Sequence, residues 1–199
     1  MAAVSVPVKI VELISAFANH LQTDFPKNNS KKSPFEHIAD LRAGFEGWIK
    51  IEFVLWAISK YGLNPLDSGD KGTHGIGIEE SVALCGKRHS KNVDIWLYVG
   101  KKGTHYIELK SLVKDYNEFK QVGSWITDFI HLKNMSEKQY PIGVASVLFA
   151  TSGSDEKWTP ATWKKYLINF TSKFNISKID YLEIITDKIA IAALINQKR

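Results

Sequence analysis

The sequence is 199 residues long, with 44% hydrophobic and 24% charged residues and a formal net charge of +5. This composition fits one globular domain and excludes a membrane-spanning segment, while the single cysteine, Cys85, excludes an internal disulfide and a cysteine-based zinc site. The basic balance allows an anionic partner such as nucleic acid without requiring one. Because the first residues lack the features of a signal peptide, we expect a cytoplasmic protein without membrane contact.

Two helices are predicted in the N-terminal third of the chain. Apolar residues at helical spacing predict the first over 8–21, and a polar, basic, proline-flanked loop follows at 26–34. The second, over about 41–61, is apolar on most faces, which is typical of a buried helix. It nevertheless carries Glu46 and Glu52. Glu52 interrupts an apolar face, where a carboxylate is costly unless a cation meets it.

Strands and helices alternate through the rest of the chain. The continuous apolar run at 141–151 is typical of a strand buried on both faces, and Thr159 with Pro160 suits the start of a helix. The predicted elements are strands at 78–84, 93–99 and 104–110, a helix at 115–133, a strand at 141–151, a helix at 158–174, and strands at 181–186 and 189–196. We therefore expect an α/β fold with a mixed central sheet flanked by helices on both faces.

Charged residues interrupt two adjacent predicted strands. Glu108 and Lys110 share one face of their strand because side chains alternate. The position of Asp94 relative to them depends on the turn. A two-residue loop of 101–102 places Asp94 and Glu108 on opposite faces, whereas a three-residue loop of 100–102 places them directly opposite one another on the same face.

The same-face register has chemical consequences. Like charges opposite each other destabilise a sheet unless a cation bridges them, and oxygen ligands from two strands suit Mg²⁺ or Mn²⁺. Lys110 would then lie beside a metal-bound water, where it could orient the nucleophile or neutralise charge on a phosphate oxygen. The opposite-face register predicts only a solvated hairpin face with a weak Glu–Lys pair.

These residues resemble a known motif. The sequence has an aspartate, Asp94, followed after thirteen residues by Glu-Leu-Lys at 108–110. This pattern resembles the motif of the PD-(D/E)xK nuclease superfamily, although Val93 stands where the motif's name has proline. That family has a restriction-endonuclease-like fold, whose core is one helix, three strands, one helix and one strand. The predicted elements over 41–151 follow this order, within a single domain of residues 1–199.

The resemblance implies roles for the hairpin residues. Asp94, Glu108 and the backbone carbonyl of Leu109 would bind Mg²⁺ or Mn²⁺, and Lys110 would assist the attacking water. The implied activity is Mg²⁺-dependent hydrolysis of phosphodiester bonds in DNA, with RNA as the other substrate left open. Cleavage of both strands of a duplex would favour a homodimer.

The resemblance also implies that two helices complete the site. A helical Glu often precedes the strands in this family, and we prefer Glu52, because it interrupts an apolar face, over Glu46. The helix after the third strand often lends a polar residue near the substrate, for which Gln121 is the candidate, with Lys120 behind it. The simpler interpretation makes Glu52 the partner of a lysine and Gln121 an ordinary helix residue.

Two other interpretations stay open. The same fold could serve as a catalytically inactive nucleic-acid-binding module, part of a larger nuclease or mobile-element complex. Alternatively, the hairpin could be the polar face of an unrelated α/β protein. The basic loops at 26–34, 86–91 and 101–102 would contact phosphates if the site exists, and would otherwise be solvated turns.

Overall fold

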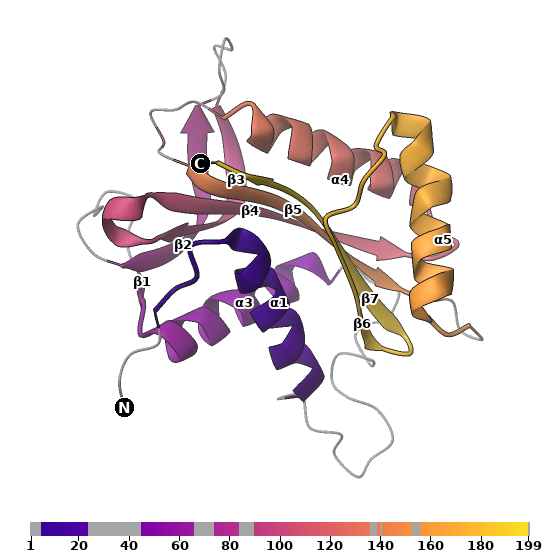
Figure 1. The fold of residues 1–199 in the computed structure, drawn as a ribbon, viewed down its shortest axis with the longest axis horizontal. Coiled ribbons are helices and arrows are strands. Elements are labelled where there is room, and N and C mark those ends of the chain that lie inside the picture. The colour runs from indigo at the N-terminus through magenta and orange to yellow at the C-terminus, as the bar shows by residue number, and fades with distance from the viewer. Residues whose placement is uncertain are drawn as a thin grey trace.

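A seven-stranded mixed sheet forms the centre of the fold, with helices against both of its faces (Figure 1). The computed structural model describes residues 5–23, 45–65, 74–83, 90–135, 139, 141–152 and 156–198. The strand order is β1-β2-β3-β4-β5-β7-β6. The α/β class and the mixed sheet covered on both sides are therefore confirmed. Among the described residues, each helix is too short or too polar to span a lipid bilayer.

The helices and strands occur in the expected order, and their bounds are close to the predicted ones. The helices are α1 (Ile10–Thr23), α3 (Glu46–Tyr61), α4 (Glu118–Lys133) and α5 (Pro160–Thr171). The strands are β1 (Asn64–Pro65), β2 (Gly75–Ala83), β3 (Ser90–Tyr98), β4 (Thr104–Val113), β5 (Pro141–Thr151), β6 (Tyr181–Thr186) and β7 (Ile189–Gln197). The expected succession of a helix, three strands, a helix and a strand runs from α3 to β5, with the two-residue strand β1 added before β2. Within it β2, β3 and β4 are antiparallel neighbours, and β4 and β5 are parallel.

Helix ends follow local sequence signals. The helix α3 ends at Gly62, which adopts a left-handed conformation (φ 63°) and donates its N–H to the carbonyl of Ile58. Glycine is favoured there because it has no Cβ to clash. The helix α5 begins with Thr159, whose side chain and that of Thr162 cap one another's backbone N–H groups, and with Pro160 in the first turn. The predicted cap at Thr159 is confirmed.

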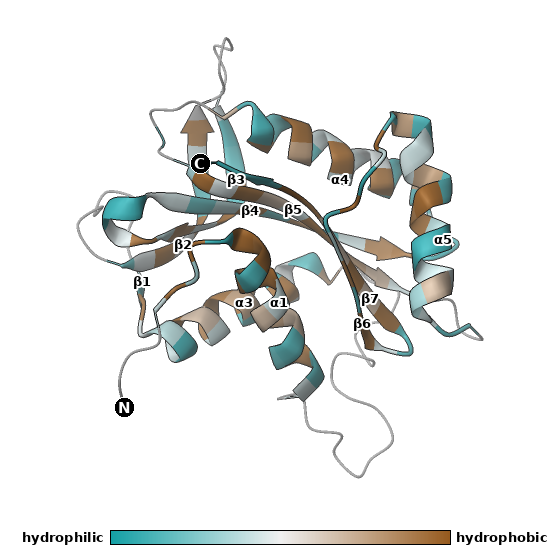
Figure 2. Cartoon of the chain, in the orientation of Figure 1, coloured by the Kyte–Doolittle hydropathy of each residue, from teal (hydrophilic) through white to brown (hydrophobic). Residues whose placement is uncertain are grey.

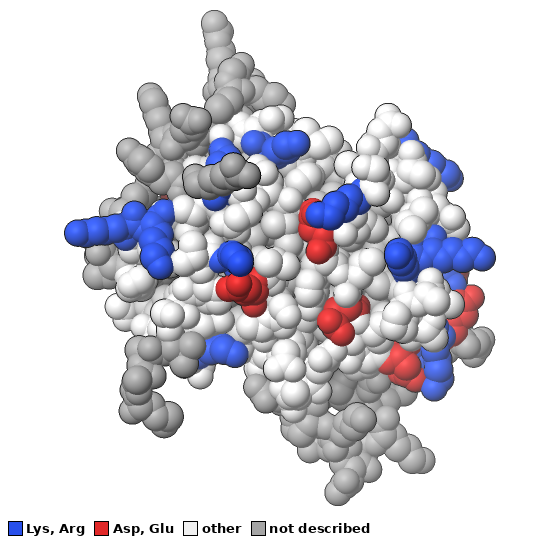
Figure 3. All heavy atoms as spheres, in the orientation of Figure 1, with Lys and Arg blue, Asp and Glu red and all other residues white. Residues whose placement is uncertain are grey.

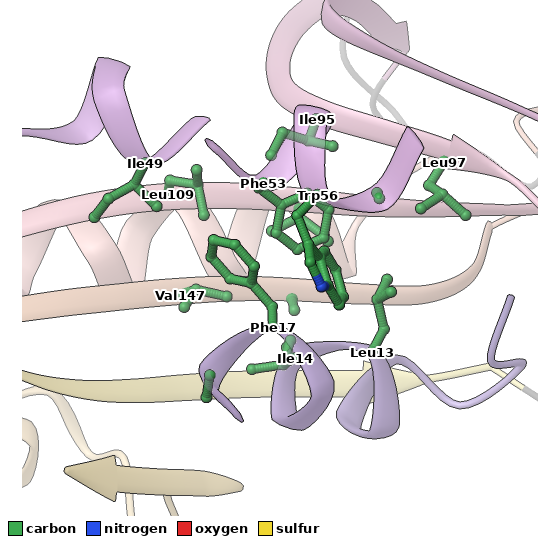
Figure 4. Close-up of a cluster of buried hydrophobic side chains, with 14 of the residues drawn as sticks. Leu13, Ile14, Phe17, Ile49, Phe53, Trp56, Ile95, Leu97, Leu109 and Val147 are labelled. Carbon is green, nitrogen blue, oxygen red and sulfur yellow. The ribbon is translucent and has the colours of Figure 1, made fainter. Parts of the chain in front are cut away.

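One face of the sheet is covered by α1 and α3 (Figure 1). Phe17 of α1 lies at the centre of this layer, with its ring centroid 4.8 Å from that of Phe53 and 5.1 Å from that of Trp56. Each such aromatic pair adds about 0.5–1.5 kcal/mol beyond the burial of its area. Figure 4 shows these rings packed against apolar side chains from three strands, namely Ile95, Leu97, Leu109 and Val147.

The opposite face is covered by α4 and α5, whose tryptophans are buried. Trp125 and Trp163 each donate the indole N–H to a strand carbonyl, at 2.8 Å to Ser146 and 3.0 Å to Ile191. The hydrophobic residues in Figure 2 accordingly follow β5 and β7, which lie between the two helical layers. The expectation that 141–151 is a strand buried on both faces is confirmed.

The β3–β4 hairpin has the register on which the site depends. Tyr98 is paired with Thr104, and Gly100–Lys102 forms a three-residue 3₁₀ turn closed by the N–H of Val99 donating to Gly103 O at 2.8 Å. Gly100 and Gly103 have φ values of 55° and 116°, which residues with a Cβ rarely adopt. The three-residue loop and the same-face register are therefore confirmed.

The two strands of this hairpin separate after a few residues. They are paired from Tyr98 with Thr104 to Ile95 with Ile107. Beyond these pairs β3 is paired with β2, and β4 with β5, so β3 and β4 diverge from Asp94 onward. The divergence leaves room for polar side chains between the strands at the positions where a regular ladder would continue.

Candidate active site

Asp94 lies at the first position of β3 beyond its pairing with β4. Its Oδ2 accepts a hydrogen bond from the N–H of Leu109 at 2.8 Å, replacing a partner that the diverging strand no longer supplies. Its Oδ1 lies 2.7 Å from Nζ of Lys50 on α3. Burial acts to raise the pKa of Asp94, but the hydrogen bonds from Lys50 and Leu109 outweigh it and hold the pKa below its ordinary value. Asp94 is therefore ionised.

Glu108 faces Asp94 from β4, and the two carboxyl groups lie beside one another. The side chain is buried, with 3% of Glu108 exposed, and Lys91 Nζ lies 2.9 Å from its Oε1. Burial, followed by the neighbouring charge of Asp94, raises the pKa of Glu108 to about 8. Two buried carboxyl groups in contact do not readily ionise together, and these opposite shifts in pKa assign a proton to Glu108 near neutral pH.

Lys110, two residues beyond Glu108, lies between two further carboxylates. Its Nζ is 3.2 Å from Asp128 of α4 and 3.4 Å from Glu46 of α3. Burial acts to lower the pKa of Lys110, but these two charges outweigh it and raise the pKa above its ordinary value. Lys110 is thus an ammonium ion held by residues from both helical layers.

Together these residues form a chain of contacts in which charges alternate, apart from the link between Asp94 and Glu108. We call this set the charge cluster. Its members, in order of contact, are Glu79, Lys50, Asp94, Glu108, Lys91, Asp128, Lys110 and Glu46. Five carboxylates face three ammonium groups, so two negative charges are unbalanced when all of them are ionised. That excess equals the charge of one divalent cation.

The donor set of the charge cluster fits Mg²⁺ or Mn²⁺ in its chemistry. Asp94 and Glu108 offer hard oxygen ligands in mutual contact, which those ions prefer. Both backbone groups of a strand residue face the same edge, so the carbonyl of Leu109 faces the divergence along with its N–H. In the described residues no three acidic, histidine or cysteine side chains converge on one point. Water and substrate would therefore have to supply the other ligands.

Glu52, which the sequence favoured over Glu46, lies outside the charge cluster. Its Oε1 is 2.9 Å from Nε2 of His20 on α1, and the alternative residue, Glu46, contacts Lys110 instead. The reason is helical periodicity. Glu46 and Lys50 are four residues apart and share one face of α3, whereas Glu52 lies about 200° around the helix from Lys50.

Gln121 also lies outside the charge cluster. Its Oε1 accepts the backbone N–H of Val113 at 3.1 Å, so the side chain closes the end of β4. Asp128, about two turns further along α4, occupies the place expected for Gln121. Asp128 is 9% exposed and is spaced three residues from Trp125 and four from Leu132, both buried. Glu52 was favoured because a carboxylate interrupts an apolar stripe of its helix. The same criterion would also have identified Asp128.

Two lysines of the charge cluster have weaker signals in the sequence. Lys50 follows Glu46 by four residues, a spacing that brings two side chains together on one helix face. Lys91 precedes Asp94 by three residues on a strand and reaches Glu108 only because β3 and β4 diverge. The basic stretch 26–34, residues 86–89 of the basic stretch 86–91, Cys85 and the start of the predicted second helix at 41–44 lie outside the described residues.

Basic residues are dispersed on the face of the molecule shown in Figure 3, where lysines stand among uncharged and acidic side chains. Comparisons of the chain with protein-family models, curated proteins and solved structures found no match. The geometry and chemistry of the charge cluster therefore provide the basis for a functional assignment.

Proposed function

We propose that the protein is a Mg²⁺- or Mn²⁺-dependent nuclease of the PD-(D/E)xK type that hydrolyses phosphodiester bonds of DNA. The restriction-endonuclease-like core would be the segment from α3 to β5. One observation carries the proposal: the carboxyl groups of Asp94 and Glu108 meet where β3 and β4 diverge, with Lys110 two residues further along the same strand. Two buried carboxyl groups in contact destabilise a fold unless a proton or a cation compensates them, so the arrangement favours a cation-binding role.

In this proposal Asp94, Glu108 and the carbonyl of Leu109 hold the metal. A bound divalent ion supplies a water of lowered pKa and neutralises charge on the phosphate. Lys110 carries a fixed positive charge beside that position and can donate a hydrogen bond to the attacking water or to a phosphate oxygen.

Glu46 and Asp128 would act through Lys110 as positioning residues. They approach its ammonium group from opposite helical layers, at 3.4 Å and 3.2 Å, and so fix the direction in which the remaining N–H can point. A lysine has a flexible stem of four carbons, and two carboxylates restrict it more than one would.

A second candidate function is a catalytically inactive nucleic-acid-binding module on the same fold. The observation that favours it is that Lys50 and Lys91 already provide cations to Asp94 and Glu108. A site neutralised by its own lysines has less need of a metal ion. The two candidates make opposite predictions for cleavage in the presence of Mg²⁺ or Mn²⁺.

Cleavage of plasmid DNA, of linear duplex DNA and of single-stranded RNA with Mg²⁺, Mn²⁺ or EDTA tests the proposal. The wild type should cleave DNA with either metal and not with EDTA, and Asp94→Ala and Lys110→Ala should lose at least about 99% of the rate. Lys157→Ala is the matched control, because Lys157 forms an exposed pair with Asp187. Activity that survives both site variants would remove these residues from the mechanism. DNA binding without metal-dependent cleavage would favour the inactive module.

A further inference from the structure

Lys50 occupies the oxygen of Asp94 on which a metal ion would depend. The other oxygen, Oδ2, is taken by the N–H of Leu109 at 2.8 Å, so Oδ1 is the one open to a cation. Lys50 Nζ lies 2.7 Å from this Oδ1 and also contacts Glu79 of β2. The side chain of Lys50 is 14% exposed, and its ammonium group therefore depends on these two carboxylates in place of water.

Lys91 has the same relationship to the other carboxyl group of the pair. Its Nζ lies 2.9 Å from Oε1 of Glu108 and also contacts Asp128 of α4. Each of the two lysines thus binds one member of the central pair and one carboxylate outside it. Both ammonium groups therefore compete with a divalent cation for oxygens of the pair.

We propose that Lys50 and Lys91 are exchangeable counter-ions of the Asp94–Glu108 pair. A divalent cation that binds the pair displaces both ammonium groups, and each lysine withdraws to its second carboxylate while remaining beside the site. This inference rests on the metal-dependent function proposed above. It adds that the affinity for metal is set by two lysines that are themselves neither metal ligands nor part of the motif.

The second carboxylates make this exchange feasible. A lysine displaced from its sole partner would leave an uncompensated buried charge, which is strongly unfavourable. Here Lys50 keeps Glu79 and Lys91 keeps Asp128, so neither ammonium group is left without a partner. When all five carboxylates are ionised, the two negative charges in excess over the three lysines are balanced by the incoming divalent ion. Competition between cations for one site is a negative coupling, and such couplings typically change affinity about 5–150-fold.

Lys110 provides the matched control for this proposal. It belongs to the same cluster and carries the same charge, but its ammonium group is paired with Glu46 and Asp128. Neither of these is a proposed metal ligand. If direct exchange sets the affinity, removing the charge of Lys110 should matter much less than removing that of Lys50 or Lys91. If the general positive charge sets it, all three should matter alike.

Titration of the full-length protein with Mn²⁺, followed by the electron paramagnetic resonance of the free ion, measures the affinity directly. Lys50→Met and Lys91→Met keep most of the aliphatic stem and remove the charge. The Mn²⁺ dissociation constant should fall about tenfold or more in each of these variants and less than about threefold in Lys110→Met. An unchanged or raised dissociation constant in Lys50→Met and Lys91→Met would overturn the exchange, as would an equal effect of Lys110→Met.

Loss of a buried lysine can also prevent folding, so a charge-balanced pair of variants accompanies the test. Lys91→Met combined with Asp128→Asn removes one charge of each sign, and circular dichroism verifies its fold. It should bind Mn²⁺ at least about fivefold more tightly than Asp128→Asn alone, and equal affinity would contradict the proposal. If the wild type and all the variants fail to bind Mn²⁺, the metal-dependent function itself is wrong. That outcome is distinct from a wild type whose affinity the lysine variants leave unchanged.

Discussion

The carboxyl groups of Asp94 and Glu108 meet at the point where β3 and β4 diverge, and their pKa values are shifted in opposite directions. The pair is asymmetric because Asp94 accepts hydrogen bonds from Lys50 and from the backbone, whereas Glu108 is more deeply buried and lies beside the charge of Asp94. One carboxyl group is therefore a proton donor and the other an acceptor near neutral pH. This asymmetry determines how stability and metal binding should depend on pH.

The free energy of unfolding should fall as the pH rises because of Glu108. Its pKa is raised from 4.5 to about 8 on folding, so its stabilising contribution is complete below about pH 4.5 and is lost as the pH approaches 8. The slope is at most about 1.4 kcal/mol per pH unit. Urea unfolding of the wild type and of Glu108→Gln at pH 5, 6, 7 and 8 measures this slope as the difference in the free energy of unfolding between the two proteins. Parallel curves would contradict the assignment of the proton to Glu108.

Metal affinity should rise with pH, because the proton on Glu108 must leave before its carboxylate can bind a cation. Below pH 8 the apparent affinity for Mn²⁺ should increase by up to about tenfold per pH unit and should level off above it. Calorimetry in two buffers of different ionisation enthalpy should detect the release of about one proton per ion at pH 6.5. An affinity that does not change between pH 6 and 8 would argue against Glu108 as a ligand.

Glu46 and Glu52 should differ in their effect on cleavage, because only Glu46 contacts Lys110. Glu46→Gln should lower kcat by about 10–100-fold, as is typical for residues that orient catalytic groups, with little change in KM for DNA. Glu52→Gln should leave both constants within about twofold, since its partner is His20. Steady-state cleavage kinetics of the two variants make the comparison. A larger loss in Glu52→Gln would restore the choice made from sequence.

The turn of the hairpin should be sensitive to a methyl group at one position. Gly103 has a φ of 116° and a ψ of −155°, a conformation that is nearly restricted to glycine. Gly103→Ala should therefore destabilise the protein by about 1–3 kcal/mol. Lys102→Ala in the same turn should change stability by less than about 0.5 kcal/mol, because Lys102 is an exposed surface residue. Thermal and urea denaturation of the two variants provide the test, and equal stabilities would contradict this conformation of the turn.

The fold was largely predictable because its elements depend on local signals. The continuous apolar run of β5 and the Thr159–Pro160 start of α5 each specify an element from a few neighbouring residues. The length of the turn fixes the register of the hairpin, and this register brings Asp94 and Glu108 together. These are short-range relationships, and the order from α3 to β5 follows from them.

The composition of the charge cluster was less predictable because it depends on contacts between distant elements. Lys91 reaches Glu108 because two strands diverge, and Asp128 reaches Lys110 because α4 packs across β4. The apolar face that favoured Glu52 places this residue beside His20 of α1. The face of α3 that carries Glu46 and Lys50 is the one that meets the hairpin. Which helix face meets which strand is decided by tertiary packing, which the spacing of charges does not encode.

A crystal structure of the wild type soaked with Mn²⁺ at pH 8, with anomalous diffraction data, tests the central claim most directly. We expect one anomalous peak coordinated by Asp94 and Glu108, beside the carbonyl of Leu109, with Lys50 and Lys91 moved toward Glu79 and Asp128. A map without a peak at this position, in which both lysines keep their contacts to Asp94 and Glu108, would contradict a metal-dependent active site.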